Sequence, residues 1–243
     1  MAKVISFATQ KGGAGKSTLA LVLAAPLAIE YGLRVAVVDC DYQQSIVKTR
    51  AQVDAANFAE LLLQEPAARY PYDVFALGLG QVFSFLDEKA AAYDLVILDL
   101  PGRADSDEVF QVLTACDAVL VPVVADYLDR SSTAEFMNLL EIIQAAADAH
   151  GLDFQYFGVV TKRVAGRREN RQLEAYLDDL GLVRFTAFLS LRVAYSRAST
   201  LYSLLNPAWL RYAGGNRETA AEIRSLCDEL MARLPLSLPS PGR

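Results

Sequence analysis

Residues 10–18 of this chain read QKGGAGKST. A short apolar run, Val4 to Ala8, precedes them, and a run rich in alanine and leucine, Leu19 to Ile29, follows them. Strand, glycine-rich loop and helix in this order suit a phosphate cradle, because the glycines let several backbone N–H groups converge on one anion. A helix that starts near Lys16 adds the positive end of its dipole. The stretch therefore predicts a P-loop.

The side chains of this loop indicate how a nucleotide would be held. Lys16 would supply a full charge near the β- and γ-phosphates, and the Ser17 hydroxyl would hold Mg²⁺. The match is specific, since the Gly-Lys-Ser ending, the preceding strand and the following helix all agree. The residues predicted to contact the nucleotide here are Gly12, Gly13, Ala14, Gly15, Lys16, Ser17 and Thr18.

Length and composition fit one α/β domain. The chain has 243 residues, 53% hydrophobic and 21% charged, which is enough to bury a full core. We expect a single domain over residues 1–234 and a flexible tail over 235–243. No apolar run reaches membrane-spanning length and no signal-peptide pattern opens the chain, so we expect a cytoplasmic protein.

Cysteine spacing and net charge narrow the function classes. Cys40, Cys116 and Cys227 form no CxxC pair, which indicates reduced core thiols and argues against an iron–sulfur ATPase. The net charge of −6 and pI near 4.9 do not suggest a protein that coats nucleic acid by bulk charge. Any contact with DNA must therefore come from a local basic patch.

Lys11 adds a second lysine to the loop. The general pattern G-x-x-x-x-G-K-[ST] places a glycine at position 10, where this chain has Gln10 followed by Lys11. KGGAGKS with this early lysine resembles the deviant Walker A motif of the ParA/MinD family of ATPases. In that family the first lysine reaches the nucleotide of a partner subunit. The resemblance implies that Lys11 and Lys16 both act in catalysis and that ATP holds two subunits together as a homodimer.

Two carboxylates follow the second predicted strand, Arg34 to Asp39. VVDCDYQQS resembles the family's DxDPQ motif, with Tyr42 where proline is usual. By that match Asp39 lies in the outer shell of the metal, and Asp41 orients or activates the attacking water near the γ-phosphate. The alternative is that two acids at a strand end merely solvate a loop.

After the glycine-rich loop, the stretch Tyr93 to Gly102, YDLVILDLPG, is the strongest indication of a nucleotide site in the sequence. Leu95 to Leu98 is typical of a strand buried on both faces, and Asp99 ends it where α/β sheets place ligand groups. This is the Walker B pattern, by which Asp99 helps to hold the Mg²⁺ hydration shell. The turn at Pro101-Gly102 is a candidate sensor of the γ-phosphate.

Further strands predict the fold. Alternating strand and helix signals without a hairpin signal indicate an α/β, doubly wound, mainly parallel sheet with helices on both faces. The other predicted strands are Asp73 to Leu77, Asp117 to Val124 and Phe154 to Thr161. The predicted helices include Ile46 to Phe58, Asp129 to Ala149, Ala194 to Leu205 and Arg217 to Leu234.

The carboxyl ends of the later strands are where the base should bind. Thr161, Lys162 and Arg163 match the place at which relatives contact the adenine, and Leu189 and Ser190 match the loop on its other side. No guanine-reading NKxD motif is visible, and the resemblance therefore favours ATP over GTP.

A basic cluster follows, with Arg167, Arg168 and Arg171 opposed by Glu169. Relatives bind DNA non-specifically through basic residues in this half of the chain, and only as the ATP dimer. The alternative is that these arginines only form the solvated face of a helix and bind no DNA. The proline-containing tail, LSLPSPGR, cannot form the basic membrane-targeting helix of MinD, so we expect no membrane contact.

The first strand begins near residue 3, so the resemblance is to short, ParF-like partition ATPases. Such proteins dimerise with ATP, sometimes form filaments, associate with the nucleoid, and hydrolyse ATP when a small centromere-binding protein of the ParB or ParG kind stimulates them. Two alternatives stay open: a ParA-like ATPase that positions a conjugation, secretion or chemotaxis complex, and a biosynthetic P-loop ligase.

Overall fold

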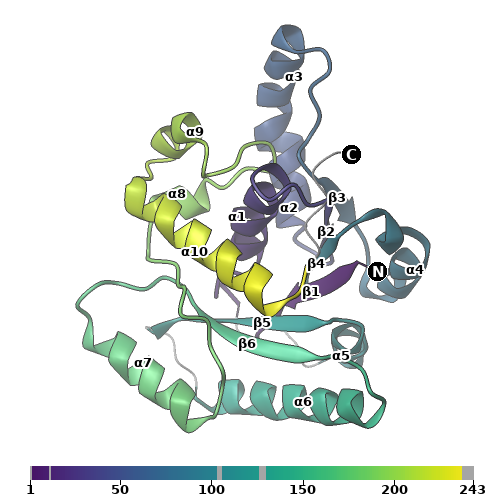
Figure 1. The fold of residues 1–243 in the computed structure, drawn as a ribbon, viewed down its shortest axis with the longest axis vertical. Coiled ribbons are helices and arrows are strands. Elements are labelled where there is room, and N and C mark those ends of the chain that lie inside the picture. Colours follow the sequence, from purple (N-terminus) through teal and green to yellow (C-terminus); the bar gives the residue numbers. More distant parts are fainter. Residues whose placement is uncertain (1, 11, 103–105, 126–129, 237–243) are drawn as a thin grey trace.

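A six-stranded parallel sheet forms the centre of the protein (Figure 1). The computed structural model describes residues 2–10, 12–102, 106–125 and 130–236. The strand order is β3-β2-β4-β1-β5-β6, and every strand pair is parallel. The strands are β1 Lys3–Phe7, β2 Val35–Asp39, β3 Asp73–Ala76, β4 Leu95–Asp99, β5 Ala118–Val123 and β6 Gln155–Val160. The prediction of a parallel sheet is confirmed.

Helices cover both faces of this sheet, as the doubly wound fold requires. On one face α1 (Lys16–Ile29) and α10 (Arg217–Arg233) pack in one apolar cluster with inward-facing residues of the central strands. On the other face α4 (Val82–Lys89), α5 (Asp107–Thr114), α6 (Arg130–Ala149) and α7 (Arg168–Asp179) contribute to a second cluster. The central strands β2, β4 and β5 are buried along their whole length because both faces are covered. No described helix is both long and apolar enough to cross a membrane.

The segment after β2 is helical for longer than the sequence predicts. Short helix α2 (Ser45–Lys48) continues through a π-helical turn, η1 (Thr49–Asp54), into α3 (Ala55–Gln64). None of the residues of α3 is buried, and the helix projects away from the sheet (Figure 1).

The helix predicted over Ala194 to Leu205 is wrong beyond residue 196. Only α8 (Val193–Ser196) forms, and α9 (Pro207–Tyr212) begins after a turn. The physical reason is the wholly buried carboxylate of Asp54, which accepts hydrogen bonds from Ser199 Oγ at 2.8 Å and from the Thr200 N–H at 2.6 Å. These bonds hold the chain in a turn at the point where the helix was expected to continue.

The ends of β2 and β4 bring two aspartates together. Asp39 and Asp99 are partners in the parallel register, and neither side chain has any exposed surface. Burial raises the pKa of Asp39. Burial also raises the pKa of Asp99, from an ordinary 3.8 to about 7, and the negative charge of Asp39 contributes to that rise.

This raised pKa predicts that folding stability depends on pH. Well below pH 3.8, Asp99 is protonated in both the folded and the unfolded chain, so its burial costs little. As the pH rises to about 7 the unfolded chain releases the proton first, and the free energy of unfolding falls by up to about 4 kcal/mol. Asp99→Asn should therefore become progressively more stable than the wild type from pH 5 to pH 8, as measured by urea unfolding in EDTA.

Asp94→Asn, in the residue just before the same strand, is the control. The hydrogen bond from Arg34 lowers the pKa of Asp94, so removing that carboxylate should destabilise the protein, and more so at pH 8 than at low pH. A stability difference between Asp99→Asn and the wild type that stays constant with pH would contradict the first prediction.

Candidate functional site

The loop between β1 and α1 has the backbone shape that the glycines were expected to permit. Gly13 and Gly15 have left-handed φ values of 76° and 99°. Gly15 is the residue that precedes α1, and its carbonyl accepts the first helical hydrogen bond, from the Leu19 N–H at 2.8 Å. A side chain at either position would be strained, so the sequence forms this loop only with glycine there.

Lys16 lies beneath the loop in a setting that favours contact with an anion. Its side chain is 8% exposed, and burial lowers the pKa of Lys16 while the charges of Asp99 and Asp41 oppose that shift. The Nζ atom lies 3.5 Å from the position that a Cβ on Gly102 would occupy. The turn after β4 therefore lies close to the ammonium group, and sensing of the γ-phosphate by Pro101-Gly102 stays a prediction.

Ser17 and Asp99 form the side of the site that is suited to a metal. Ser17 Oγ donates a hydrogen bond of 2.5 Å to Asp99 Oδ2, whereas Asp99 Oδ1 is buried and has no partner among the described residues. No described group of three His, Cys, Asp or Glu side chains could hold a metal by itself. One hydroxyl and one free carboxylate oxygen fit Mg²⁺, which keeps several waters and takes its other ligands from phosphates.

Asp39 has a different environment from its neighbour. Its Oδ2 accepts hydrogen bonds from the Ile46 and Val47 N–H groups at 2.9 and 3.2 Å, and its Oδ1 accepts one from Asp41 at 3.3 Å. These donors belong to the loop after β2 and to the first turn of α2, so Asp39 fixes the start of that helix. With both oxygens occupied, Asp39 is suited to an outer-shell position and not to direct metal contact.

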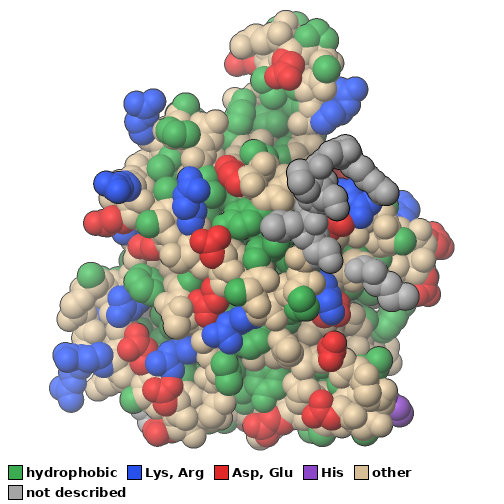
Figure 2. Space-filling view, viewed as in Figure 1, with side chains coloured by type: hydrophobic (Ala, Val, Ile, Leu, Met, Phe, Trp, Pro, Cys, Tyr) green, Lys and Arg blue, Asp and Glu red, His purple; other side chains and the backbone are tan. Residues whose placement is uncertain are grey.

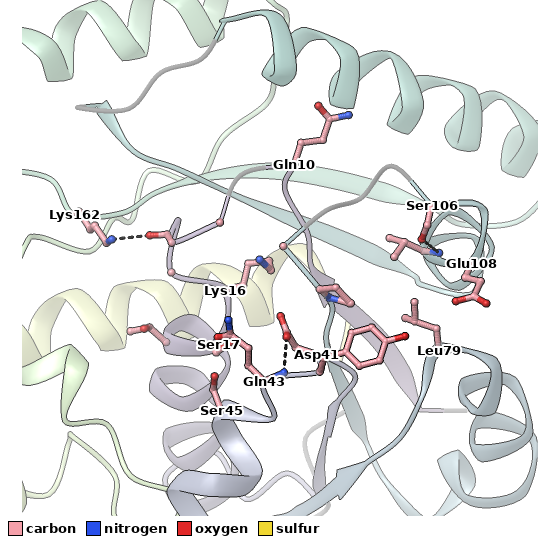
Figure 3. Close-up of a pocket in the computed structure, with 18 residues that line it drawn as sticks. Gln10, Lys16, Ser17, Asp41, Gln43, Ser45, Leu79, Ser106, Glu108 and Lys162 are labelled. Carbon is pink, nitrogen blue, oxygen red and sulfur yellow. Dashed lines mark hydrogen bonds between the residues drawn. The ribbon is translucent and has the colours of Figure 1, made fainter.

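Asp41 lies at the edge of a cavity of about 880 Å³ that Lys16 and Ser17 also line. Figure 3 shows these three side chains around one space, with the Asp41 carboxylate accepting a 2.9 Å hydrogen bond from the Gln43 N–H. Tyr42, which stands where the family motif has proline, is 95% exposed. Gln10 and Gln43, which lie in the two sequence motifs but were given no role, also line it. The lining includes further residues that were not predicted: Ser45, Leu79, Ser106, Glu108 and Val109.

A second cavity of about 130 Å³ adjoins the first and shares Gly15, Thr18 and Lys162 with it. Thr161 Oγ1 donates a 2.9 Å hydrogen bond to the Ala14 carbonyl, and Lys162 Nζ donates one of 2.6 Å to the Gly13 carbonyl. Lys162 also has a left-handed φ of 53°, which is uncommon for a residue with a side chain and is often found at functional sites. Thr161, Lys162 and Leu189, three of the residues predicted to lie around the base, line this second cavity.

Arg163 does not belong to this second cavity. Its guanidinium lies 4.4 Å from the ring centre of Phe188 and 3.6 Å from the carboxylate of Glu174, on the side that faces α7. The prediction that Arg163 contacts the base therefore needs correction, because packing against α7 turns the side chain away. The cavity is lined instead by Ser190, Leu191, Arg192, Tyr195 and Ser196, of which only Ser190 had been placed near the base.

Arg167, Arg168 and Arg171 are exposed at the start of α7, away from both cavities. Figure 2 shows blue Lys and Arg side chains gathered over this end of the helix. Lys11 and the tail from residue 237 lie outside the described residues.

The chain is similar in sequence to known proteins over most of its length. The chain is 29% identical to the maintenance of carboxysome distribution protein A of Gloeobacter kilaueensis over 231 residues, 94% of each protein. It is 32% identical to the chromosome-partitioning ATPase Soj of Thermus thermophilus over 190 residues, 71% of this chain and 74% of Soj.

Solved structures share the fold. Apo McdA of Cyanothece superposes with a TM-score of 0.66 at 17% identity, covering 95% of this chain and all of McdA. A plasmid partition protein of Borrelia burgdorferi bound to AMPPNP gives a TM-score of 0.59 at 18% identity, covering 96% and 99% of the two chains. Residues 5–202 match the family described as the CobQ/CobB/MinD/ParA nucleotide binding domain. Because this match spans most of the sequence, the chain belongs to the ParA/MinD family of P-loop NTPases, as its glycine-rich loop predicts.

Proposed function

We propose that this chain is an ATP-dependent, dimerising switch ATPase that acts in DNA partition. The observation that carries the proposal is the meeting of Lys16, Ser17 and Asp41 around one open cavity, with the buried Asp99 carboxylate bonded to Ser17. A cation for the phosphates, an oxygen pair for Mg²⁺ and a carboxylate at the edge are the parts that phosphoryl transfer to water requires.

Each residue has a role that follows from its position. The loop N–H groups and Lys16 bind and orient the triphosphate, and burial strengthens the field of Lys16 because water screens it little. Mg²⁺ on Ser17 and Asp99 would neutralise charge between the β- and γ-phosphates. Asp41, half-buried and near Lys16, orients the attacking water and accepts its proton.

The openness of the cavity supports dimerisation. The fully exposed ring of Tyr42 stands beside Asp41, and Gln10, the neighbour of Lys11, lines the same cavity. A second subunit would exclude water from the phosphates at this opening, and Lys11 would then reach the partner's nucleotide. Within this proposal residues 1–234 are the ATPase domain and 235–243 a tail.

The charge order of α7 supports a DNA-binding role for Arg167, Arg168 and Arg171. Arg168 and Arg171 outnumber Glu169 at the start of the helix, which ends with Asp178 and Asp179. This is the reverse of the order that the helix dipole favours, so helix stability does not account for it. In our proposal the ATP dimer associates with the nucleoid through this patch, and a small centromere-binding partner stimulates hydrolysis and release.

One relative favours a second candidate function. The protein from Gloeobacter kilaueensis is named for carboxysome distribution, and it covers more of this chain than Soj does. A ParA-like ATPase that positions a protein cargo would use the same switch and the same DNA patch. Pull-down of the ATP-bound protein distinguishes the two: a centromere-binding protein supports partition, and a component of a large protein assembly supports cargo positioning.

The two lysines of the loop should have separable effects. Lys16→Ala removes the buried ammonium and should weaken ATP binding by about two orders of magnitude. Lys11→Ala should retain ATP binding but lose ATP-dependent dimerisation. Titration calorimetry and sedimentation velocity measure the two properties, and normal dimerisation of Lys11→Ala would remove the role proposed for that lysine.

Asp41→Ala should trap the ATP-bound dimer. Because a positioned general base contributes about 10²-fold or more, phosphate release should fall by at least that factor while the dimer persists in sedimentation. Asp87→Ala, which removes an exposed carboxylate from α4, is the control and should hydrolyse ATP normally. Unchanged turnover in Asp41→Ala would mean that another group activates the water.

DNA binding should depend on ATP, on salt and on the start of α7. Arg168→Ala/Arg171→Ala removes four cations from a dimer, so the slope of log affinity against log salt should become shallower by roughly 3 to 4. Arg211→Ala/Arg217→Ala removes the same number of exposed arginines elsewhere and serves as the control. Equal losses in both variants, measured by fluorescence anisotropy with ATP, would indicate bulk charge and contradict the patch.

A further inference from the structure

Two glutamates of α10, Glu222 and Glu229, bond to the segment that follows α7. They lie about two helical turns apart, so both face the same side of the helix. Their side chains are 12% and 14% exposed. Glu229 accepts hydrogen bonds from the Thr186 and Ala187 N–H groups at 3.0 and 2.9 Å. Glu222 makes the corresponding contacts farther along the segment, where it borders the second cavity.

Glu222 is the shared acceptor for three residues of the cavity wall. Ser190 donates to it twice, from its N–H at 2.8 Å and its hydroxyl at 2.7 Å. Tyr195 donates its phenolic hydrogen at 2.6 Å, and Arg192 donates from Nε at 3.3 Å and Nη2 at 3.0 Å. Five donors therefore converge on one carboxylate that stands behind the wall and does not line the cavity.

The ionised state of Glu222 suits this arrangement. Burial alone would raise its pKa, but the hydrogen bonds from Tyr195, Ser190 and Arg192 outweigh burial and lower the pKa of Glu222. The carboxylate is thus charged at neutral pH and can accept from every donor around it.

Glu222 also determines the charge of the cavity. Arg192 lines it, but its guanidinium is paired with Glu222 at 3.0 Å and Glu218 at 2.9 Å. Lys162, the other cation in the lining, donates to the Gly13 carbonyl at 2.6 Å. What remains is a small space beside Leu19, Leu189 and Tyr195, suited to a flat uncharged ring and not to another phosphate.

We propose that Glu222 is a positioning residue for the nucleotide base, because it holds Ser190, Arg192 and Tyr195 in the shape of the base pocket and neutralises Arg192. The inference rests on the proposed function, since it takes the first cavity to hold the phosphates. Glu222 touches no part of the nucleotide, and its effect is exerted through the cavity wall.

Binding of ADP and of pyrophosphate, each with Mg²⁺, tests the role of Glu222. Both ligands use the phosphate loop, but only ADP carries a base, and neither requires dimerisation or hydrolysis. Glu222→Gln should weaken ADP binding by about tenfold or more, since it removes the charge on which five donors converge, and should leave pyrophosphate binding within about twofold. Titration calorimetry gives both constants.

Glu229→Gln is the matched control. It removes an equally buried carboxylate from the same helix, so it should lower the melting temperature to a similar extent, but the ratio of ADP to pyrophosphate affinity should stay at the wild-type value. Tyr195→Phe removes a single donor to Glu222 and should shift the ratio in the same direction as Glu222→Gln, by less, even where Glu222→Gln folds poorly.

The role of Glu222 would be overturned if Glu222→Gln kept the wild-type ratio of ADP to pyrophosphate affinity. It would also be overturned if Glu229→Gln lowered that ratio by the same amount. Wild-type protein that binds ADP no better than pyrophosphate would overturn the base pocket itself. Wild-type protein that binds ADP well but does not dimerise with ATP would contradict the proposed switch and leave the inference about Glu222 standing.

Discussion

The site depends on burying two carboxylates side by side at the edge of a parallel sheet. Asp39 and Asp99 end neighbouring strands in register, and neither reaches solvent. Such burial is costly unless the oxygens find donors or cations. Asp39 finds three backbone N–H groups, whereas Asp99 has the Ser17 hydroxyl and an oxygen without a described partner. This asymmetry separates a carboxylate that holds the fold from one that is available to a metal.

Buried carboxylates also connect the two halves of the site. Asp39 fixes the start of α2, which continues through the π-helical turn to Asp54. Asp54 holds Thr200, just after α8, and α8 carries Tyr195 in the wall of the second cavity, where Glu222 bonds to it. At each of these connections a carboxylate accepts hydrogen bonds from backbone or hydroxyl donors. Loops that lie far apart in sequence are thereby held in fixed positions around the two adjoining cavities.

The sequence predicts what local patterns encode. Buried strands are apolar runs, and the loop glycines stand where the backbone needs positive φ, so the strands, P-loop and strand-end aspartates are all visible in one stretch each. The failures depend on distant partners. The helix predicted after Ala194 ends early because of a bond to Asp54, 146 residues away from Thr200, and Arg163 turns toward Glu174 and Phe188. Glu222 shows no signal because an amphipathic helix with scattered glutamates is ordinary, and its role depends on which loop packs against it.

The oxygen of Asp99 that has no partner among the described residues links stability to the proposed function. A protein without ligand keeps this carboxyl protonated over much of the pH range or accepts the cost of its charge, since burial raises its pKa to about 7. A divalent cation bound beside Ser17 would favour the ionised form, and would be bound more tightly for the same reason. Ligand binding of this kind stabilises the folded chain in proportion to its affinity. In the proposed function, the cost of burying the Asp99 carboxylate would therefore be offset when nucleotide and metal bind beside Ser17.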